Sequence, residues 1–194
     1  MPPVPKFNKV KIITAALNLV RRVGLAGLTA RGLGVELGTS SRPIFTAFRN
    51  MEEVQNETML AARDLYNGYV DKGLSADNAF KGVGMQYIRF AKEEPQLFRV
   101  LFMTANETSF SLDNVLPAID DNSGKILTSI KNTYGLSQKL SYKLYQNLWI
   151  FTHGIACLYA TGVSQLTEEE ASARLTEVFT GLLIQIKIEG KKDD

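Results

Sequence analysis

The sequence predicts an all-α fold, with an N-terminal unit of three helices in residues 1–54 and a larger helical domain in residues 55–194. Apolar residues recur three and four positions apart along most of the chain, and glycines and prolines separate these runs. We find no convincing strand pattern of alternating apolar and polar residues. A chain of 194 residues, 45% of them hydrophobic, is also long enough to bury a sizeable core.

The first two predicted helices each end at a glycine. Residues 9–23 place apolar side chains at helical spacing, and Gly24 closes this segment. Thr29 is a suitable N-cap for the second helix, which runs to Gly38. The second helix contains two glycines that each cost up to about 1 kcal/mol relative to alanine. Tertiary packing therefore has to hold it in place.

The third predicted helix is short and contains a proline near its start. Proline is tolerated in the first turn of a helix, so the helix has to begin just before Pro43. We predict Ser40 as its N-cap, with Ser41, Arg42 and Pro43 in the first turn. The helix is expected to end near Phe48.

Two capping boxes mark the starts of long helices further along the chain. Asn50 with Glu53 opens a helix that runs to about residue 71, and Thr167 with Glu170 opens the last helix. Residues 104–123 are the least periodic part of the chain, and no helix is predicted there. The last helix is expected to run to about residue 189, and the other helices are predicted at residues 78–93, 95–103, 124–134 and 137–160.

Positive charge is concentrated at the N-terminal end of the chain. Residues 1–54 contain eight Lys or Arg and three Asp or Glu, a net charge of +5, whereas residues 55–194 carry −3. A locally basic unit of this kind favours a polyanionic partner.

Other bulk features favour a cytoplasmic protein. A single cysteine cannot form an internal disulfide and suits a reducing compartment. The opening stretch "MPPVPKFNKVK" lacks the apolar segment of a signal peptide, and no apolar run approaches the roughly 18 residues of a membrane span. We therefore predict cytoplasmic localisation and no membrane partner.

The second and third helices form a helix-turn-helix pattern in a basic unit. Two short helices joined by a tight turn at Gly38 can place the second helix in the major groove of double-stranded DNA. Any small helical bundle can also contain such a turn. The residues expected to face DNA are Ser41, Arg42, Pro43 and Thr46, and those expected to pack inward or along the edge are Ile44, Phe45 and Phe48.

The same residues resemble a known family. The stretch "LTARGLGVELGTSSRPIFTAFRNMEEV" resembles the N-terminal signature of TetR/AcrR-type transcriptional regulators, and "RRVGLAGLT" is similar to the run before it. This similarity covers roughly residues 9–55. It implies an all-α homodimer that binds a palindromic operator and releases it when a small effector binds the C-terminal domain. The segment "LWIFTHGIACL" resembles one C-terminal domain type of this family, the WHG domain.

Three positions depart from the family pattern. The family's turn glycine corresponds to Gly38 and its closing aromatic to Phe48. Phe45 stands where the family usually has a phosphate-binding tyrosine, Ala47 where it often has a histidine, and Met51 where it has a lysine. Because phosphate contacts supply much of the affinity for DNA, we expect binding to depend on the basic residues that are present. The candidate DNA-contacting residues are Lys6, Lys9, Thr29, Arg31, Thr39, Ser40, Ser41, Arg42, Pro43, Phe45, Thr46 and Arg49.

Aromatic residues of the C-terminal domain are candidates for an effector site. Tyr145, Trp149 and His153 step by four along one helix face. They are either a core stripe with one hydrogen-bonded histidine or part of a pocket in which Tyr145 and His153 are polar contacts. A lining that is mostly aromatic suits a small hydrophobic or amphipathic molecule. The candidate ligand-binding residues are Tyr87, Phe90, Phe98, Phe102, Tyr145, Trp149 and His153.

Metal, cofactor and catalytic sites are not predicted. His153 and Cys157 supply two possible metal ligands, and no neighbouring cluster supplies the others. A single histidine without a nucleophile motif offers little for catalysis. The stretch "GLGVELG" follows a helix rather than a strand, so it does not indicate a dinucleotide site.

The last two helices are predicted to form the dimer contact. Their apolar stripe is larger than one small domain can cover, which suits a four-helix contact about a two-fold axis. This stripe consists of Leu148, Ile155, Leu175, Val178, Phe179, Leu182 and Ile186.

A rival interpretation is that the chain has the same ancestry as these regulators but does not bind operator DNA. In it, the chain is a helical protein that binds a ligand or a partner and has lost DNA recognition. The residues at positions 45, 47 and 51 favour this rival, whereas Arg42 and the basic N-terminal unit oppose it. A small enzyme is a third class, and the sequence offers no catalytic constellation for it.

Overall fold

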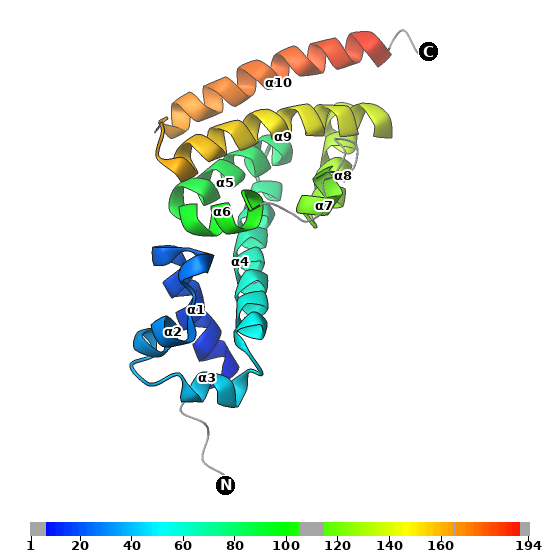
Figure 1. Ribbon diagram of the computed structural model, residues 1–194. Coiled ribbons are helices and arrows are strands. Elements are labelled where there is room, and N and C mark those ends of the chain that lie inside the picture. Colours follow the sequence, from blue (N-terminus) through cyan, green and yellow to red (C-terminus); the bar gives the residue numbers. More distant parts are fainter. Residues whose placement is uncertain (1–6, 105–114, 165, 191–194) are drawn as a thin grey trace. The chain divides into compact units, whose positions relative to one another are not determined.

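A computed structural model of the chain describes residues 7–104, 115–164 and 166–190. Over these residues the chain is helical and contains no strand, which confirms the predicted all-α class (Figure 1). The helices are α1 (Lys9–Val23), α2 (Ala30–Glu36), α3 (Arg42–Ala47), α4 (Met51–Leu74), α5 (Ala79–Glu93), α6 (Pro95–Phe102), α7 (Val115–Ile119), α8 (Ser123–Tyr134), α9 (Gln138–Thr161) and α10 (Glu168–Gly190), with a short 3₁₀ turn η1 (Leu25–Gly27) after α1. No helix within the described ranges is both long enough and apolar enough to cross a membrane.

The chain divides into two compact units. Unit 1 comprises Met1–Tyr66 and Glu94–Thr104, and unit 2 comprises Asn67–Glu93 and Ala105–Asp194. The helix α4 contributes its first part to unit 1 and its last part to unit 2, and α6 belongs to unit 1. These units describe packing, so the functional division after residue 54 stays a prediction.

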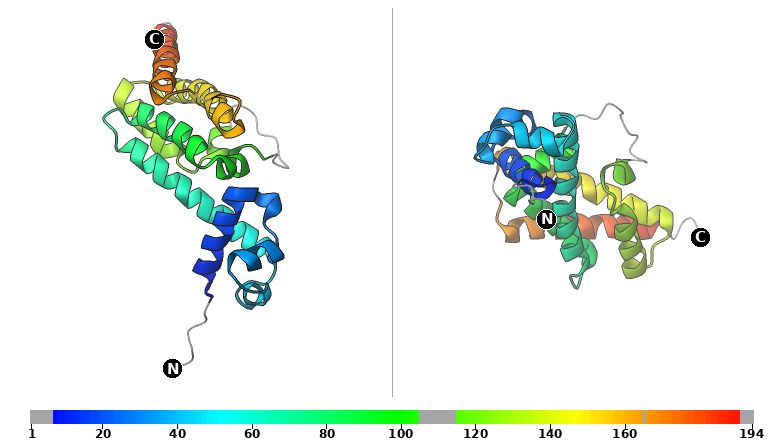
Figure 2. Two further views of the ribbon diagram at one scale, coloured as in Figure 1. Left: turned by 90° about the vertical axis from the view of Figure 1, so that its left-hand side faces the viewer. Right: turned by 90° about the horizontal axis from the view of Figure 1, so that it is seen from below.

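Unit 1 is built around α1. Ile12 and Ala16 on α1, Leu33 on α2 and Ile44 on α3 are completely buried. The helices α1, α2 and α3 gather together in the two further views as well (Figure 2). These apolar contacts explain why α2 is helical despite its two glycines, because packing offsets their low helix propensity.

An ion pair joins α1 to the start of α6 within unit 1. The Nε and Nη2 atoms of Arg21 donate to the two carboxylate oxygens of Glu94, each over 2.8 Å. Two parallel hydrogen bonds of this kind fix orientation as well as distance.

Unit 2 consists of longer helices around an aromatic and aliphatic core. The helices α9 and α10 lie side by side, and α5 and α8 pack against α9 (Figure 1). Phe90 on α5, Ile126 and Ile130 on α8 and Leu144 on α9 are completely buried. The core of unit 2 is therefore shared by several helices, including α5, α8 and α9.

The predicted helix caps are confirmed where they depend on local sequence. The hydroxyl oxygen of Thr29 accepts a hydrogen bond from the amide of Gly32 at 3.1 Å. The Thr167 hydroxyl accepts from the Glu170 amide at 3.2 Å, and the Glu170 carboxylate accepts from the Thr167 amide at 2.8 Å. This reciprocal pair is the predicted capping box of α10.

Two boundary predictions are wrong. The helix α3 begins at Arg42 and its N-cap is Ser41 rather than Ser40, although the Ser40 hydroxyl still accepts from the Arg42 amide at 3.4 Å. The Ser41 carbonyl already accepts from the Ile44 amide at 3.1 Å, so the helical bonding pattern starts there. A short helix, α7, also lies where none was predicted. Five residues are too few for a periodic pattern to emerge.

The predicted dimer stripe needs correction as well. Leu148 and Ile155 of α9 are each only 6% exposed, and Leu175 and Ile186 of α10 are 4% and 1% exposed. These four side chains are covered within the chain itself, because α10 packs along α9. They cannot provide an apolar surface for a second subunit.

Candidate functional site

A tight turn between α2 and α3 positions the third helix in unit 1. Gly38 in this turn has a φ of +64°, which glycine adopts without strain. The backbone of the turn passes very close to Gly34 of α2, where an added Cβ would lie 3.0 Å from the Thr39 carbonyl oxygen. The Thr39 amide donates to the Gly34 carbonyl oxygen at 2.9 Å. Gly34 therefore lets the turn lie against α2, a positioning role that the sequence analysis missed.

The helix α3 has a buried face and an exposed face. Ile44 is completely buried and Phe48, which follows the helix, is 3% exposed, as predicted for both. Phe45 does not pack inward, because it is 48% exposed. Arg42 and Thr46 are exposed as well, and the spacing of these three residues places them on one face. An exposed aromatic ring between an arginine and a threonine suits contact with a partner.

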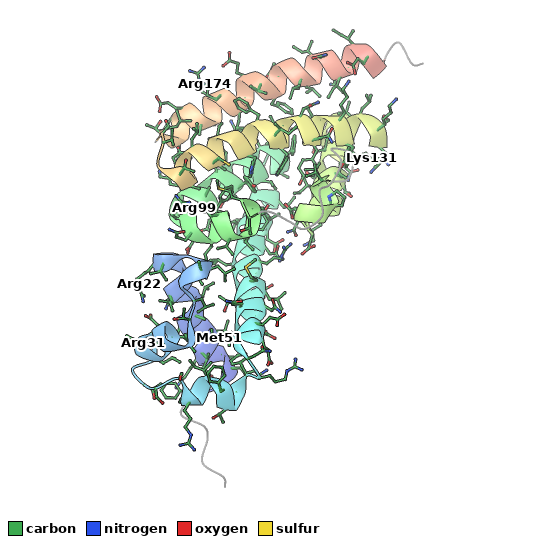
Figure 3. The ribbon with its side chains drawn as sticks, in the orientation of Figure 1. Arg22, Arg31, Met51, Arg99, Lys131 and Arg174 are labelled. Carbon is green, nitrogen blue, oxygen red and sulfur yellow. The ribbon has the colours of Figure 1, made fainter. Side chains whose placement is uncertain are left out.

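Two exposed arginines in this region have no acidic partner among the residues that the structure describes. Arg42 is the first residue of α3. Arg31, which is labelled in Figure 3, lies in the first turn of α2. Among the described residues, neither forms an ion pair. Their guanidinium groups are therefore available to an anion.

Lys9 and Arg49 share one carboxylate. The Glu53 carboxylate accepts from Lys9 Nζ at 2.9 Å, from the Arg49 backbone amide at 2.7 Å and from Arg49 Nε at 3.3 Å. The Arg49 amide and the Lys9 ammonium lower the pKa of Glu53 to about 2. Lys9 also lies over the ring of Phe48, 4.7 Å from its centroid. Both cations thus already have an anionic neighbour within unit 1.

The other predicted DNA-contacting residues lie at helix starts or in the turn. Ser40 and Thr39 belong to the turn before α3, and Pro43 is the second residue of α3, where its ring interrupts no helical hydrogen bond. Thr29 and Ser41 are the N-caps of α2 and α3. Lys6 lies outside the described residues. The predicted DNA-contacting residues that the structure describes therefore all belong to unit 1, and most of them lie on α3 or in the turn before it.

The predicted effector residues fall into both units. Phe98 and Phe102 belong to α6 in unit 1, where their ring centroids are 5.3 Å apart. The remaining residues, Tyr87, Phe90, Tyr145, Trp149 and His153, belong to unit 2. Whether they bind an effector stays a prediction.

His153 is the centre of a hydrogen-bonded group in unit 2. The Tyr87 hydroxyl lies 2.9 Å from His153 Nδ1, and Cys157 Sγ lies 3.4 Å from His153 Nε2. The indole of Trp149 stacks on the imidazole, with the ring centroids 5.0 Å apart.

Burial sets the protonation of this group. It lowers the pKa of His153 and raises the pKa of Tyr87 well above its usual value. The imidazole is therefore uncharged at neutral pH and the phenol keeps its proton. These uncharged groups satisfy one another's hydrogen-bonding capacity. This favours the interpretation that the stripe of Tyr145, Trp149 and His153 is part of the core.

A cavity in unit 2 involves none of the predicted effector residues. It has a volume of about 240 Å³ and lies among α5, α8, α9 and α10. Residues that line it include Phe80, Lys81, Gly84, Leu148, Leu175 and Phe179. The sequence analysis missed this site because its residues are scattered over 100 positions of the chain. The described residues hold no group of three or more His, Cys, Asp or Glu side chains placed to bind a metal ion.

Comparison with known proteins identifies the C-terminal part of the chain. Residues 80–183, more than half of the sequence, match the family model described as "Tetracyclin repressor-like, C-terminal domain". No curated protein matches the chain. The family model does not bear on the WHG subtype, which stays a prediction. The matched domain covers most of unit 2, and the described chain is helical. The chain therefore belongs to the tetracyclin repressor-like family of regulators.

Proposed function

We propose that the chain is a cytoplasmic, ligand-responsive transcriptional repressor that binds palindromic operator DNA as a homodimer. The observation that carries this proposal is the exposed face of α3, where Arg42 is the first residue and pairs with no carboxylate in the described part of the chain. The turn over Gly34 holds this helix at the surface of a basic unit. Membership of the tetracyclin repressor-like family supports the same function.

Each side chain on the exposed face has a contact that it can make with DNA. The Arg42 guanidinium can donate two hydrogen bonds to the O6 and N7 atoms of a guanine. The exposed ring of Phe45 suits the methyl group of a thymine, and Arg31 suits a backbone phosphate. The phenylalanine cannot replace the phosphate hydrogen bond of a tyrosine, so more of the affinity rests on the arginines.

Measurement of DNA binding tests this assignment. Duplexes selected from a random-sequence pool would be titrated with the protein at several salt concentrations, using fluorescence anisotropy. We expect Arg42→Ala to cost roughly 1–3 kcal/mol and to relax the preference at one base pair. Arg174→Ala is the matched control, because this exposed arginine lies in unit 2 and pairs only with its neighbour Glu177 in the described residues (Figure 3). Equal losses for the two variants would contradict the proposed role of Arg42.

The homodimer is supported by apolar residues that the fold leaves exposed. Ile184 and Ile188 on α10 are 57% and 54% exposed, and Ile150 and Leu158 on α9 are 46% and 36% exposed. Each pair lies on one face of its helix, at spacings of four and eight residues. We propose that these side chains, rather than the four buried residues of the predicted stripe, meet their equivalents in a second copy.

Analytical ultracentrifugation tests the dimer. Ile184→Asp should shift the protein toward monomer, because it buries a charge in the proposed contact. Leu60→Asp is the matched control, since Leu60 is also 57% exposed and lies on α4 in unit 1. A monomeric parent protein at micromolar concentration would contradict the proposal.

In the rival proposal, the chain is a member of the same family that binds a ligand or a partner but does not bind operator DNA. The residues Phe45, Ala47 and Met51 favour it, because none of them donates a side-chain hydrogen bond to phosphate. Failure to select any duplex from the pool, even at low salt, would establish this rival.

A further inference from the structure

The cavity in unit 2 has an apolar inner end. Phe80, Leu148 and Leu175, which line it, are 6%, 6% and 4% exposed. The ring of Phe179 meets those of Phe80 and Tyr134, with centroid distances of 6.2 Å and 5.2 Å. This end can only accept a hydrocarbon chain or ring.

Gly84 leaves part of the space open. A Cβ at this position would lie 3.6 Å from Leu175 Cδ1, which is an ordinary van der Waals contact. An alanine would therefore fit without disturbing α5, and it would occupy volume that the glycine leaves to the cavity.

The other end of the cavity is polar and exposed. Asn78, Lys81, Thr176 and Thr180 line the cavity and are all exposed, so they lie where it opens to solvent. A ligand with an apolar body and a polar head matches this division.

The hydrogen bonds at this opening determine which polar atoms remain for a ligand head. Asn78 Oδ1 already accepts from the Lys81 backbone amide at 3.0 Å and from the Tyr134 hydroxyl at 3.2 Å. A backbone amide only donates, which identifies the atom facing it as the oxygen and leaves the Asn78 amide nitrogen as a donor. The hydroxyls of Thr176 and Thr180 donate to carbonyl oxygens of their own helix, at 2.8 Å and 2.7 Å.

The polar groups at the opening therefore favour an anion. Lys81 contributes an ammonium group and Asn78 an amide donor, and no carboxylate is among the described residues that line the cavity. An acidic head would receive charge-assisted hydrogen bonds from Lys81 and Asn78, whereas a cationic head would be repelled by Lys81 and would find only neutral acceptors such as the Thr176 and Thr180 hydroxyl oxygens.

We propose that this cavity binds an amphipathic monocarboxylate, with its alkyl or aryl part among Phe80, Leu148 and Leu175 and its carboxylate beside Lys81 and Asn78. An apolar cavity of about 150 Å³ holds one benzene molecule. The 240 Å³ found here has room for a medium-chain acid or for a ring with a short side chain. The claim that this cavity binds a ligand depends on the cavity alone. The further claim that the cavity is the effector site of the repressor rests on the proposed function.

Isothermal titration calorimetry of the full chain with octanoate tests the site, with octanamide as a neutral ligand of the same size. We expect octanoate to bind about threefold to tenfold more tightly than octanamide, and this preference should shrink as salt is added. Equal binding of the two ligands would overturn the assignment of an anionic head.

Two variants with matched controls test whether octanoate and octanamide bind in this cavity. Lys81→Gln should remove the preference for octanoate and leave octanamide binding unchanged, whereas Lys139→Gln, at an exposed lysine of α9, should change neither. Gly84→Ala should weaken both ligands about fourfold by removing the space of one methylene group. Gly68→Ala is its control, because a Cβ there would meet nothing within 4 Å. Identical binding by Gly84→Ala and Gly68→Ala would overturn the site.

The outcomes separate this inference from the proposed function. Octanoate binding that responds to Lys81→Gln and Gly84→Ala supports the cavity even if no DNA is bound. Specific DNA binding with no binding of octanoate or 3-phenylpropionate overturns the cavity assignment and leaves the repressor intact.

Discussion

Both units join their helices through exposed ion pairs, but most of the aromatic contacts between helices in the described residues lie in unit 2. In unit 1, Arg22 pairs with Glu36 and Lys9 pairs with Glu53. In unit 2, the ring of Phe90 meets that of Tyr69 edge-on at a centroid distance of 5.3 Å. The net charge also differs, since unit 1 has ten Lys or Arg against six Asp or Glu and unit 2 has twelve against fourteen.

This difference separates two kinds of binding surface. Exposed ion pairs contribute little to stability, so the charges of unit 1 are better explained by a polyanionic partner than by folding. Unit 2 buries many apolar side chains in its core and still contains a cavity of about 240 Å³. A charged surface suits DNA, and an apolar volume suits a small molecule.

The largest expected effect is loss of the unit 2 core. Phe90→Ala should lower the free energy of unfolding by about 3–5 kcal/mol, because it empties a fully buried site. Arg22→Met, which removes the exposed pair with Glu36 in unit 1, should leave stability nearly unchanged. Urea denaturation followed by circular dichroism measures both. Comparable losses would show that surface charge holds unit 1 as firmly as the aromatic core holds unit 2.

The next effect is a pH dependence that arises in unit 2. Burial lowers the pKa of His153 below 6.5, so below that pH the unfolded chain binds a proton that the folded chain does not. The free energy of unfolding should therefore fall as the pH drops from 6.5 through the lowered pKa, by at most about 1.4 kcal/mol per pH unit. His153 is the single histidine of the chain, so His153→Gln should flatten this slope. An unchanged slope would show that other groups cause it.

The N-caps of α10 in unit 2 and α3 in unit 1 differ in their side-chain bonds. Thr167→Ala should destabilise the protein by about 1 kcal/mol, because it removes half of the capping box of α10. Ser41→Ala in unit 1 should cost less than about 0.5 kcal/mol, because the Ser41 side chain makes no capping bond to α3. Thermal unfolding of the two variants tests this contrast, and a larger loss for Ser41→Ala would reverse it.

The smallest effect concerns the carboxylate that holds two cations of unit 1. If the proposed function is correct, Glu53→Gln releases Lys9 and Arg49 toward DNA phosphate. The plot of log affinity against log salt should then become steeper by about 0.9 for each of these cations that gains a phosphate contact, which is roughly a threefold change per contact between 50 and 200 mM salt. Glu57→Gln makes the same change of charge at an exposed position of α4 and should steepen the plot less. Equal slopes for the two variants would show that releasing Lys9 and Arg49 adds nothing.

Most helix limits and caps could be predicted from the sequence because they depend on residues a few positions apart. The bonds of Thr29 with Gly32 and of Thr167 with Glu170 join residues three positions apart. The exposed position of Arg42 on α3 follows in the same way from the proline beside it and the apolar residues that follow. The five-residue α7 escaped prediction because local periodicity needs more than one turn.

Tertiary structure alone decided which apolar faces are covered and which are left over. Leu175 and Ile186 face the chain's own core, whereas Ile184 and Ile188 stay exposed, and a helical pattern cannot distinguish these stripes until α9 is in place. The cavity beside Gly84 depends on four helices at once. Propensity and capping act between near neighbours, but burial is a property of residues that meet only when distant segments pack together.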